Sequence, residues 1–156
     1  MRNGSTMRTA IASRPPFYKQ ETPPLVSRRA LRMVLAGLGL DVAESELRIL
    51  CDCTPFGTDA VKAVDAARRL GFTVTTKHTL SAHELATLVG RSAYPIVFVN
   101  ILPIDGIKGE QAFIILEFSG ASVAVYDPLL GERTLPRASF DAAWAMMHNL
   151  AIIVEL

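Results

Sequence analysis

Cysteine is scarce in this chain of 156 residues, which contains only Cys51 and Cys53. One residue separates them, and a disulfide bond across so short a spacing would be strained, so we expect no structural disulfide. Zinc sites commonly use cysteines two residues apart with a second pair of ligands, and the sequence shows no second pair. A reducing compartment is therefore the default, and we predict no metal and no cofactor.

The sequence also lacks a large charge of either sign and a long hydrophobic run. Its 16 basic and 15 acidic side chains leave a net charge of +1, which gives no general attraction to nucleic acid or to an anionic membrane. No stretch reaches the roughly 18 consecutive apolar residues of a membrane span, and the N-terminal region has no apolar segment typical of a secretory signal. We therefore predict no direct membrane insertion and a cytoplasmic protein that reaches the inner face of the membrane only through a partner.

Apolar residues make up 50% of the chain, which is enough for the core of one domain of this length. Residues 1–16 are mostly polar, include two consecutive prolines and show no periodicity. These features are typical of a disordered tail, so we predict a tail at 1–16 and a single domain at 17–156.

Apolar residues in the first half of the chain recur at the spacing of an α-helix. Ser27 is a candidate N-cap of the central helix and Gly39 a candidate stop, whereas Ser81 and Glu84 have the spacing of a capping box. The arginines at the start of the central helix are expected to form a solvated face. The predicted helices cover residues 27–38, 43–50, 58–70 and 81–88.

Runs of β-branched and aromatic residues, which are typical of strands, gather in the second half of the chain. Ser119 and Gly120 lie between two such runs and predict a hairpin turn, and Asp127 with Pro128 ends the second strand of that hairpin. Helices followed by an antiparallel sheet make the predicted fold class α+β. The predicted strands cover residues 72–76, 96–101, 113–118, 123–126 and 150–154, with a helix at 140–147.

Residues 20–35 read QETPPLVSRRALRMVL, and this stretch resembles the opening of the peptidase C39 family. Those papain-like cysteine peptidases trim double-glycine leaders from bacteriocin precursors. In the family, a Gln that donates to the oxyanion stands six residues before the catalytic Cys, and that Cys opens a helix. Gln20 matches the Gln, and Val26 falls on the Cys. The resemblance spans residues 18–156 and implies a papain-like fold, with N-terminal helices packed on a C-terminal antiparallel sheet.

The catalytic triad of the family is Cys, His and Asp, and the resemblance implies where each would lie. The Asp falls on Asp127, and the His falls on Gln111, or on Ala112 if the register slips by one residue. A valine cannot attack a carbonyl, and neither glutamine nor alanine acts as a base near neutral pH. The site is therefore degenerate, keeping the oxyanion Gln and the orienting Asp but no nucleophile or base, at positions Gln20, Val26, Gln111 and Asp127.

The resemblance implies a catalytically inactive domain that binds a peptide or a secreted-protein substrate. In the family, degenerate copies occur at the N-terminus of type I secretion ABC exporters, where they hold the secreted substrate. The expected partners are a double-glycine leader or another protein substrate, together with an ABC exporter. We expect a bacterial protein linked to bacteriocin processing or to type I export.

Two other classes of function stay open at this point. An active hydrolase would use Cys51, Cys53 or Ser27 as a relocated nucleophile, with a histidine brought close by folding. None of the three histidines of the chain stands at a triad position. Alternatively, the fold serves only as a structural or regulatory surface for another protein.

Overall fold

A computed structural model describes residues 14–16, 26–52 and 59–155. Gln20 and Cys53 lie outside these ranges, so the roles expected of them stay predictions. None of the helices in the described part is long and apolar enough to cross a membrane. These helices are α1 (Val26–Gly37), α2 (Glu44–Asp52), α3 (Asp59–Arg69), α4 (Ala82–Gly90), the short α5 (Leu102–Asp105) and α6 (Arg137–Ala145).

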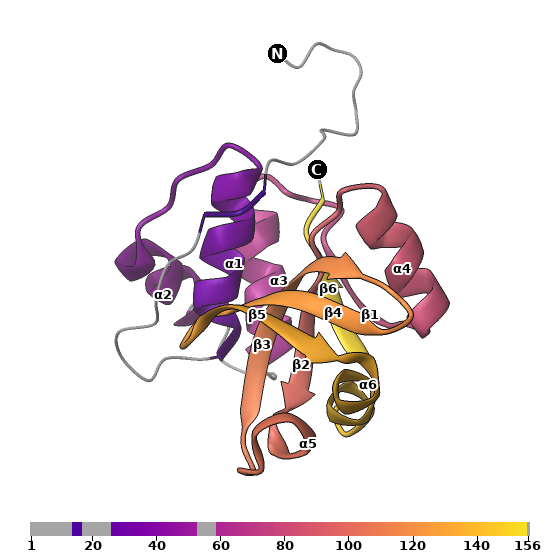
Figure 1. Cartoon of the computed structure of the whole chain (residues 1–156). Coiled ribbons are helices and arrows are strands. Elements are labelled where there is room, and N and C mark those ends of the chain that lie inside the picture. Colours follow the sequence, from indigo (N-terminus) through magenta and orange to yellow (C-terminus); the bar gives the residue numbers. More distant parts are fainter. Residues whose placement is uncertain (1–13, 17–25, 53–58, 156) are drawn as a thin grey trace.

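An antiparallel sheet in the order β1-β6-β2-β3-β4-β5 runs through the centre of the described chain. Helices α1, α2 and α3 pack on one face of the sheet, and α4 and α6 pack on the other (Figure 1). This arrangement confirms the predicted α+β class. The strands are β1 (Thr76–Thr79), β2 (Ile96–Asn100), β3 (Glu110–Phe118), β4 (Ser122–Asp127), β5 (Gly131–Pro136) and β6 (Leu150–Ile153).

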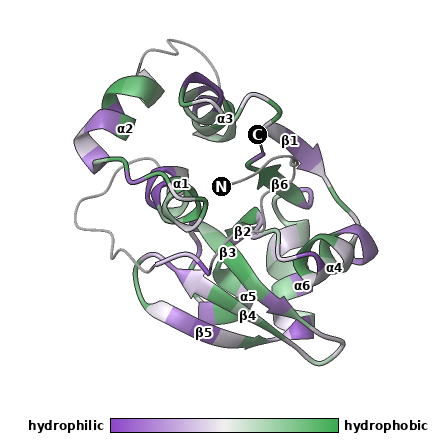
Figure 2. Cartoon of the chain, turned by 90° about the horizontal axis from the view of Figure 1, so that it is seen from above, coloured by the Kyte–Doolittle hydropathy of each residue, from purple (hydrophilic) through white to green (hydrophobic). Residues whose placement is uncertain are grey.

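The central strand β3 is buried on both faces, because helices cover each side of the sheet. Successive side chains of a strand point to opposite faces. Ala112 and Ile114 therefore share a core with α1, α2 and α3, whereas Phe113 and Ile115 share a core with α4 and α6. In Figure 2, β3 is largely green and the edge strands β1 and β5 are largely purple. The apolar residues of β3 thus alternate between the two helical layers.

Several local predictions are confirmed. The hydroxyl of Ser81 accepts the N–H of Glu84 at 3.1 Å, and the Glu84 carboxylate accepts the N–H of Ser81 at 2.8 Å, which is the predicted capping box of α4. Gly39 follows α1 with φ of +95°, a conformation that glycine adopts at little cost. The hairpin between β3 and β4 forms where Ser119 and Gly120 predicted it. Local chemistry was therefore sufficient to place these ends and turns.

The start of α1 differs from the prediction. The helix begins at Val26, so Ser27 is its second residue rather than its N-cap. The predicted solvated face of arginines is also wrong, because Arg28 and Arg29 are only 6% and 4% exposed. Arg29 forms an ion pair with Glu44 at the start of α2. A buried charge requires such a partner, and the pair ties the first two helices together.

The predicted strand at 72–76 is wrong, because β1 begins only at Thr76. The carbonyl of Phe72 accepts the N–H of Thr75, so these residues form a turn. The ring of Phe72 is buried in the core below α1 and α3, and the hydroxyl of Thr75 bonds the backbone of Glu155. Aromatic and β-branched residues favour strands mainly because they pack well on a half-buried surface. A buried turn can therefore carry the same residue types as a strand.

The predicted tail at 1–16 and domain at 17–156 stay predictions. Three residues of that tail, 14–16, belong to the described part, and Pro15 is buried. Neither α5 nor β5 was predicted. β5 is an edge strand of mainly polar residues that buries only Leu135 fully, and α5 is a single turn, so neither leaves a long apolar pattern.

We predict that Leu31→Ala destabilises the protein by about 3 kcal/mol, because the fully buried Leu31 side chain packs α1 on the sheet and its loss leaves a cavity. Ile49→Ala is the matched control, since Ile49 is also a helical aliphatic residue but is 66% exposed. Its change should stay within about 0.5 kcal/mol. Urea unfolding measures both, and equal effects would contradict the assigned packing of α1.

Candidate functional site

The predicted nucleophile position lies at the start of a helix, as the resemblance requires. Val26 is the first residue of α1. The first turn of a helix presents unpaired N–H groups and the positive end of the helix dipole, which stabilise a thiolate where a cysteine occupies that place. A valine offers no group that could use this field. If the predicted alignment holds, Val26 stands where the first turn of α1 would stabilise a thiolate.

The two candidates for the histidine position lie on opposite faces of the sheet. Gln111 pairs with Val99 and Ala112 pairs with Phe98 across β2 and β3. Ala112 and Phe98 belong to the core that contains α1, whereas Val99 belongs to the core that contains α6. Both candidates are buried, and the amide oxygen of Gln111 accepts the N–H of Ala112 at 3.0 Å. Ala112 is thus the candidate on the face that α1 covers.

A β-bulge in β3 decides this difference. Ile115 pairs with Val125 and Glu117 pairs with Ala124, so Leu116 is an extra residue on β3. Without that residue, counting back from the hairpin would place residue 111 on the α1 face. One inserted residue moves every side chain beyond it to the other face, so residue 112 takes that place. This is the one-residue slip that the sequence left open.

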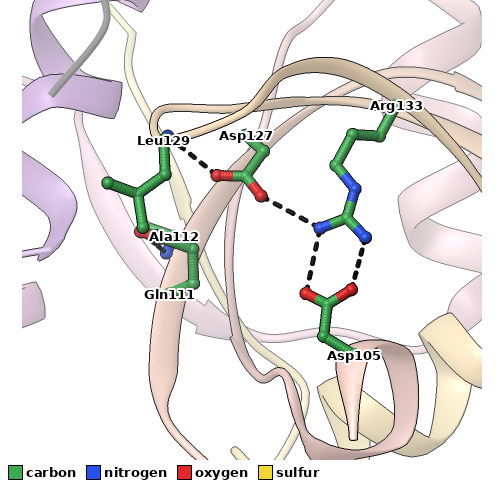
Figure 3. Close-up of polar contacts among 6 residues, drawn as sticks. All are labelled: Asp105, Gln111, Ala112, Asp127, Leu129 and Arg133. Carbon is green, nitrogen blue, oxygen red and sulfur yellow. Dashed lines mark hydrogen bonds and ion pairs between the residues drawn. The ribbon is translucent and has the colours of Figure 1, made fainter. Parts of the chain in front are cut away.

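Asp127 is buried, only 3% exposed, and both of its carboxylate oxygens are engaged. Oδ1 accepts the N–H of Leu129 at 2.8 Å, which closes the turn between β4 and β5. Oδ2 accepts a hydrogen bond from Nη1 of Arg133 on β5 at 3.0 Å. Figure 3 shows the carboxylate between these two donors. Its position favours holding the turn rather than orienting a mobile side chain.

Arg133 joins Asp127 to a second carboxylate, that of Asp105 in α5. Its Nη2 donates to Oδ1 of Asp105 at 2.6 Å, and its Nη1 donates to Oδ2 at 3.1 Å (Figure 3). The two hydrogen bonds with Asp105 raise the pKa of Arg133, the single hydrogen bond with Asp127 adds to this, and burial opposes it. A planar guanidinium suits such paired contacts. The cluster fixes α5 against the turn that follows β4.

Sequence patterns missed Asp105 and Arg133 as members of this site. Asp105 lies in the single-turn helix that was not predicted, 28 residues before Arg133. The one sequence feature that could have indicated this cluster is Arg133 itself, a charged residue two positions after Gly131 on a short polar strand. Alternation within that strand places Arg133 on the same face as Val125, with which it pairs.

His78 and His148 lie far from Asp127. His78 is on β1, and β1 is separated from β4 by β6, β2 and β3. Four strand spacings amount to about 19 Å across the sheet. His148 precedes β6, three spacings from β4, or about 14 Å. The fold therefore brings neither of these two histidines to the hairpin that carries the predicted triad positions.

His78 and His83 instead line a separate cavity of about 350 Å³ beside α4, together with Glu84, Arg91 and Glu155. No group of three or more His, Cys, Asp or Glu side chains in the described part of the chain is arranged to hold a metal ion. This cavity therefore offers no metal centre among the residues that the structure places.

Cys51 does not support a relocated nucleophile. It is 1% exposed and packs with Leu47 of α2 in the core that contains α1. A thiol buried among apolar side chains is held away from solvent and substrate. Cys53 and the side chain of Ser27 lie outside what the structure describes.

A comparison with protein families matches residues 19–155 to the Peptidase C39 family. Because this match covers most of the sequence, the chain belongs to the peptidase C39 family. No curated protein matches the chain by sequence.

Solved structures of related domains share the fold. A double glycine motif protease from an AMS/PCAT transporter, in complex with the leader peptide, aligns with a TM-score of 0.69 and 19% identity, covering 91% of each chain. The peptidase domain of Streptococcus ComA, a bi-functional ABC transporter of a quorum sensing pathway, aligns with a TM-score of 0.64 and 20% identity, over 89% of this chain and 97% of that one. A C39-like peptidase from Bacillus anthracis gives 0.76 and 18%, over 96% and 99%. At these identities the likeness shows the fold alone.

We predict that Arg133→Leu destabilises the protein by about 3 kcal/mol, because it leaves the buried charge of Asp127 without a positively charged partner. Adding Asp127→Asn removes that charge while keeping an acceptor for Leu129, so the double variant should recover about half of the loss. Urea unfolding measures all variants.

The control for this series is Arg69→Leu, which breaks an exposed ion pair with Asp65 one turn away on α3. Its cost should stay below about 0.5 kcal/mol. If Arg133→Leu costs no more than Arg69→Leu, the cluster around Asp127 contributes no stability, contrary to the assigned role.

Proposed function

We propose that this C39 domain binds a peptide or secreted-protein substrate without cutting it. The observation that carries the proposal is the composition of β3 on the face that α1 covers. The residue there is Ala112, its neighbour on the other face is Gln111, and neither can accept a proton from a nucleophile. Val26, at the start of α1, also supports the proposal, because a valine side chain has no nucleophilic group.

The chemistry of a cysteine peptidase explains why these two positions matter most. A thiolate at a helix N-terminus attacks the carbonyl, and a histidine beside it later protonates the leaving amine. The third residue only orients the histidine. Asp127 retains the identity of that third residue, but its oxygens bind Leu129 and Arg133. With nucleophile and base absent, substrate binding is the part of the mechanism that the fold can still perform.

The ligand and partner are proposed from the relatives. One related domain was solved with a leader peptide, and another is the peptidase domain of an ABC transporter. For this chain we propose a double-glycine leader or the protein attached to it as ligand, and an ABC exporter as partner. A cytoplasmic place at the inner face of the membrane, in bacteriocin or type I export, belongs to the same proposal.

A titration with a fluorescent double-glycine leader peptide, followed by mass spectrometry of the same samples, tests this function. We expect saturable binding and an intact peptide, because the fold is kept and the reacting groups are absent. Cleavage would overturn the inactive assignment and direct attention to Cys53 and Ser27. If the peptide neither binds nor is cleaved, a role as a structural or regulatory partner replaces peptide binding.

The position equivalent to the family histidine can be tested by rebuilding it. We predict that Val26→Cys with Ala112→His gives a thiol that reacts with iodoacetamide at pH 6.5 at least about tenfold faster than Val26→Cys with Gln111→His. Ala112 shares the face covered by α1, and a neighbouring imidazolium lowers the pKa of a thiol from about 8.5. Val26→Cys alone is the baseline, with circular dichroism to check folding. The opposite order of rates would place the family histidine at residue 111.

A further inference from the structure

Residues 14–16 are a short described stretch that lies upstream of the part of the chain matched by the family. Arg14 and Pro16 are exposed, and Pro15 between them is buried. Two consecutive prolines fix φ near −65° and keep the residue before them extended. This stretch therefore lies against the domain as a short extended peptide.

Arg14 contacts two neighbouring side chains of the sheet. Its Nη2 lies 2.7 Å from Oε1 of Glu132 on β5, and its guanidinium carbon lies 5.3 Å from the ring centre of Tyr126 on β4. Tyr126 and Glu132 pair across the two strands, so they stand side by side on one face. Glu117 adds further attraction for the same cation. An aromatic ring and a carboxylate together suit an arginine side chain.

This contact lies beside the degenerate site. Tyr126 pairs with Ile114, two residues along β3 from Ala112. Tyr126, Ile114 and Ala112 belong to the same core, on the face that α1 covers. Diagonal neighbours of this kind are about 7–8 Å apart. Arg14 thus occupies a position next to the one where a peptidase of this family would hold its base.

The contact is exchangeable rather than permanent. The side chains of Arg14 and Glu132 are 51% and 49% exposed, and an ion pair of that exposure is weak and screened by salt. Its persistence comes from the covalent tether, which keeps Arg14 at a high effective concentration near Tyr126. A free peptide of the same chemistry can therefore displace it.

We propose that Tyr126 and Glu132 form a subsite for the arginine of an extended, cationic peptide, and that Arg14 of the chain itself fills this subsite until such a peptide binds. The proposal rests on the proposed peptide-binding function and adds two things to it. It names a ligand class, an arginine followed by proline in extended form. It also makes the segment at 14–16 an intramolecular competitor of that ligand.

The test uses the full chain and a fluorescent octapeptide that copies residues 11–18, IASRPPFY. Arg14→Ala in the protein should tighten octapeptide binding by about threefold to tenfold, because the competitor loses its ion pair and its ring contact. Adding Glu132→Gln to that variant should reverse the gain. An octapeptide with alanine in place of its arginine should have no higher affinity for any protein variant than for the wild-type protein.

Arg137→Ala is the matched control, since Arg137 also stacks on an aromatic ring, that of Phe118 at 4.1 Å, and also pairs with a carboxylate, that of Asp141. It should leave octapeptide affinity at the wild-type value. Thermal unfolding of each variant checks folding. Equal affinity of wild type and Arg14→Ala, or full binding to the variant that also carries Glu132→Gln, overturns the subsite.

The same variants separate this inference from the proposed function. If the octapeptide follows the expected order while the leader peptide does not bind, the subsite stands and the leader-binding function fails. If the leader binds and the octapeptide shows no dependence on Arg14, the function stands and the subsite is wrong.

Discussion

Burial of β3 between two layers of helices is the constraint on which the site depends. In a strand that is enclosed on both sides, successive buried side chains point alternately into the two cores, and each must fit the core that it enters. The bulge at Leu116 sets which residues face α1, and with them what chemistry that face can offer. Ala112 and Ile114 therefore complete the apolar core that α1 covers, and we propose residue 112 as the match to the family's histidine.

The same alternation divides the end of β4 and β5 into two functional faces. Asp127 and Arg133 lie on the side of α5, where a buried carboxylate has to be neutralised by a partner. Tyr126 and Glu132 lie on the side of α1, where they meet Arg14. Asp127, which we propose as the match to the Asp of the family's triad, thus stabilises a turn. The neighbouring positions give the adjacent surface an affinity for a cation.

The sequence predicted an element well where the interactions that form it join residues close together along the chain. The capping box at Ser81 and Glu84, the stop at Gly39 and the hairpin at Ser119 arise from residues a few positions apart, and all three were found. The strand expected at 72–76 failed because the burial of Phe72 comes from distant helices. The burial of Arg29 was missed because its partner Glu44 lies on another helix.

The sequence by itself determined the family, the α+β class and the identities Val26, Gln111, Ala112 and Asp127, because these follow from residue types and their spacing along the chain. Only the tertiary structure decided that Ala112 faces α1, that Arg133 holds Asp127 to Asp105, and that Arg14 lies on Tyr126. Each of these depends on strand register or on contacts between segments many residues apart. One extra residue in a strand reverses its faces without altering the local pattern from which the strand is predicted.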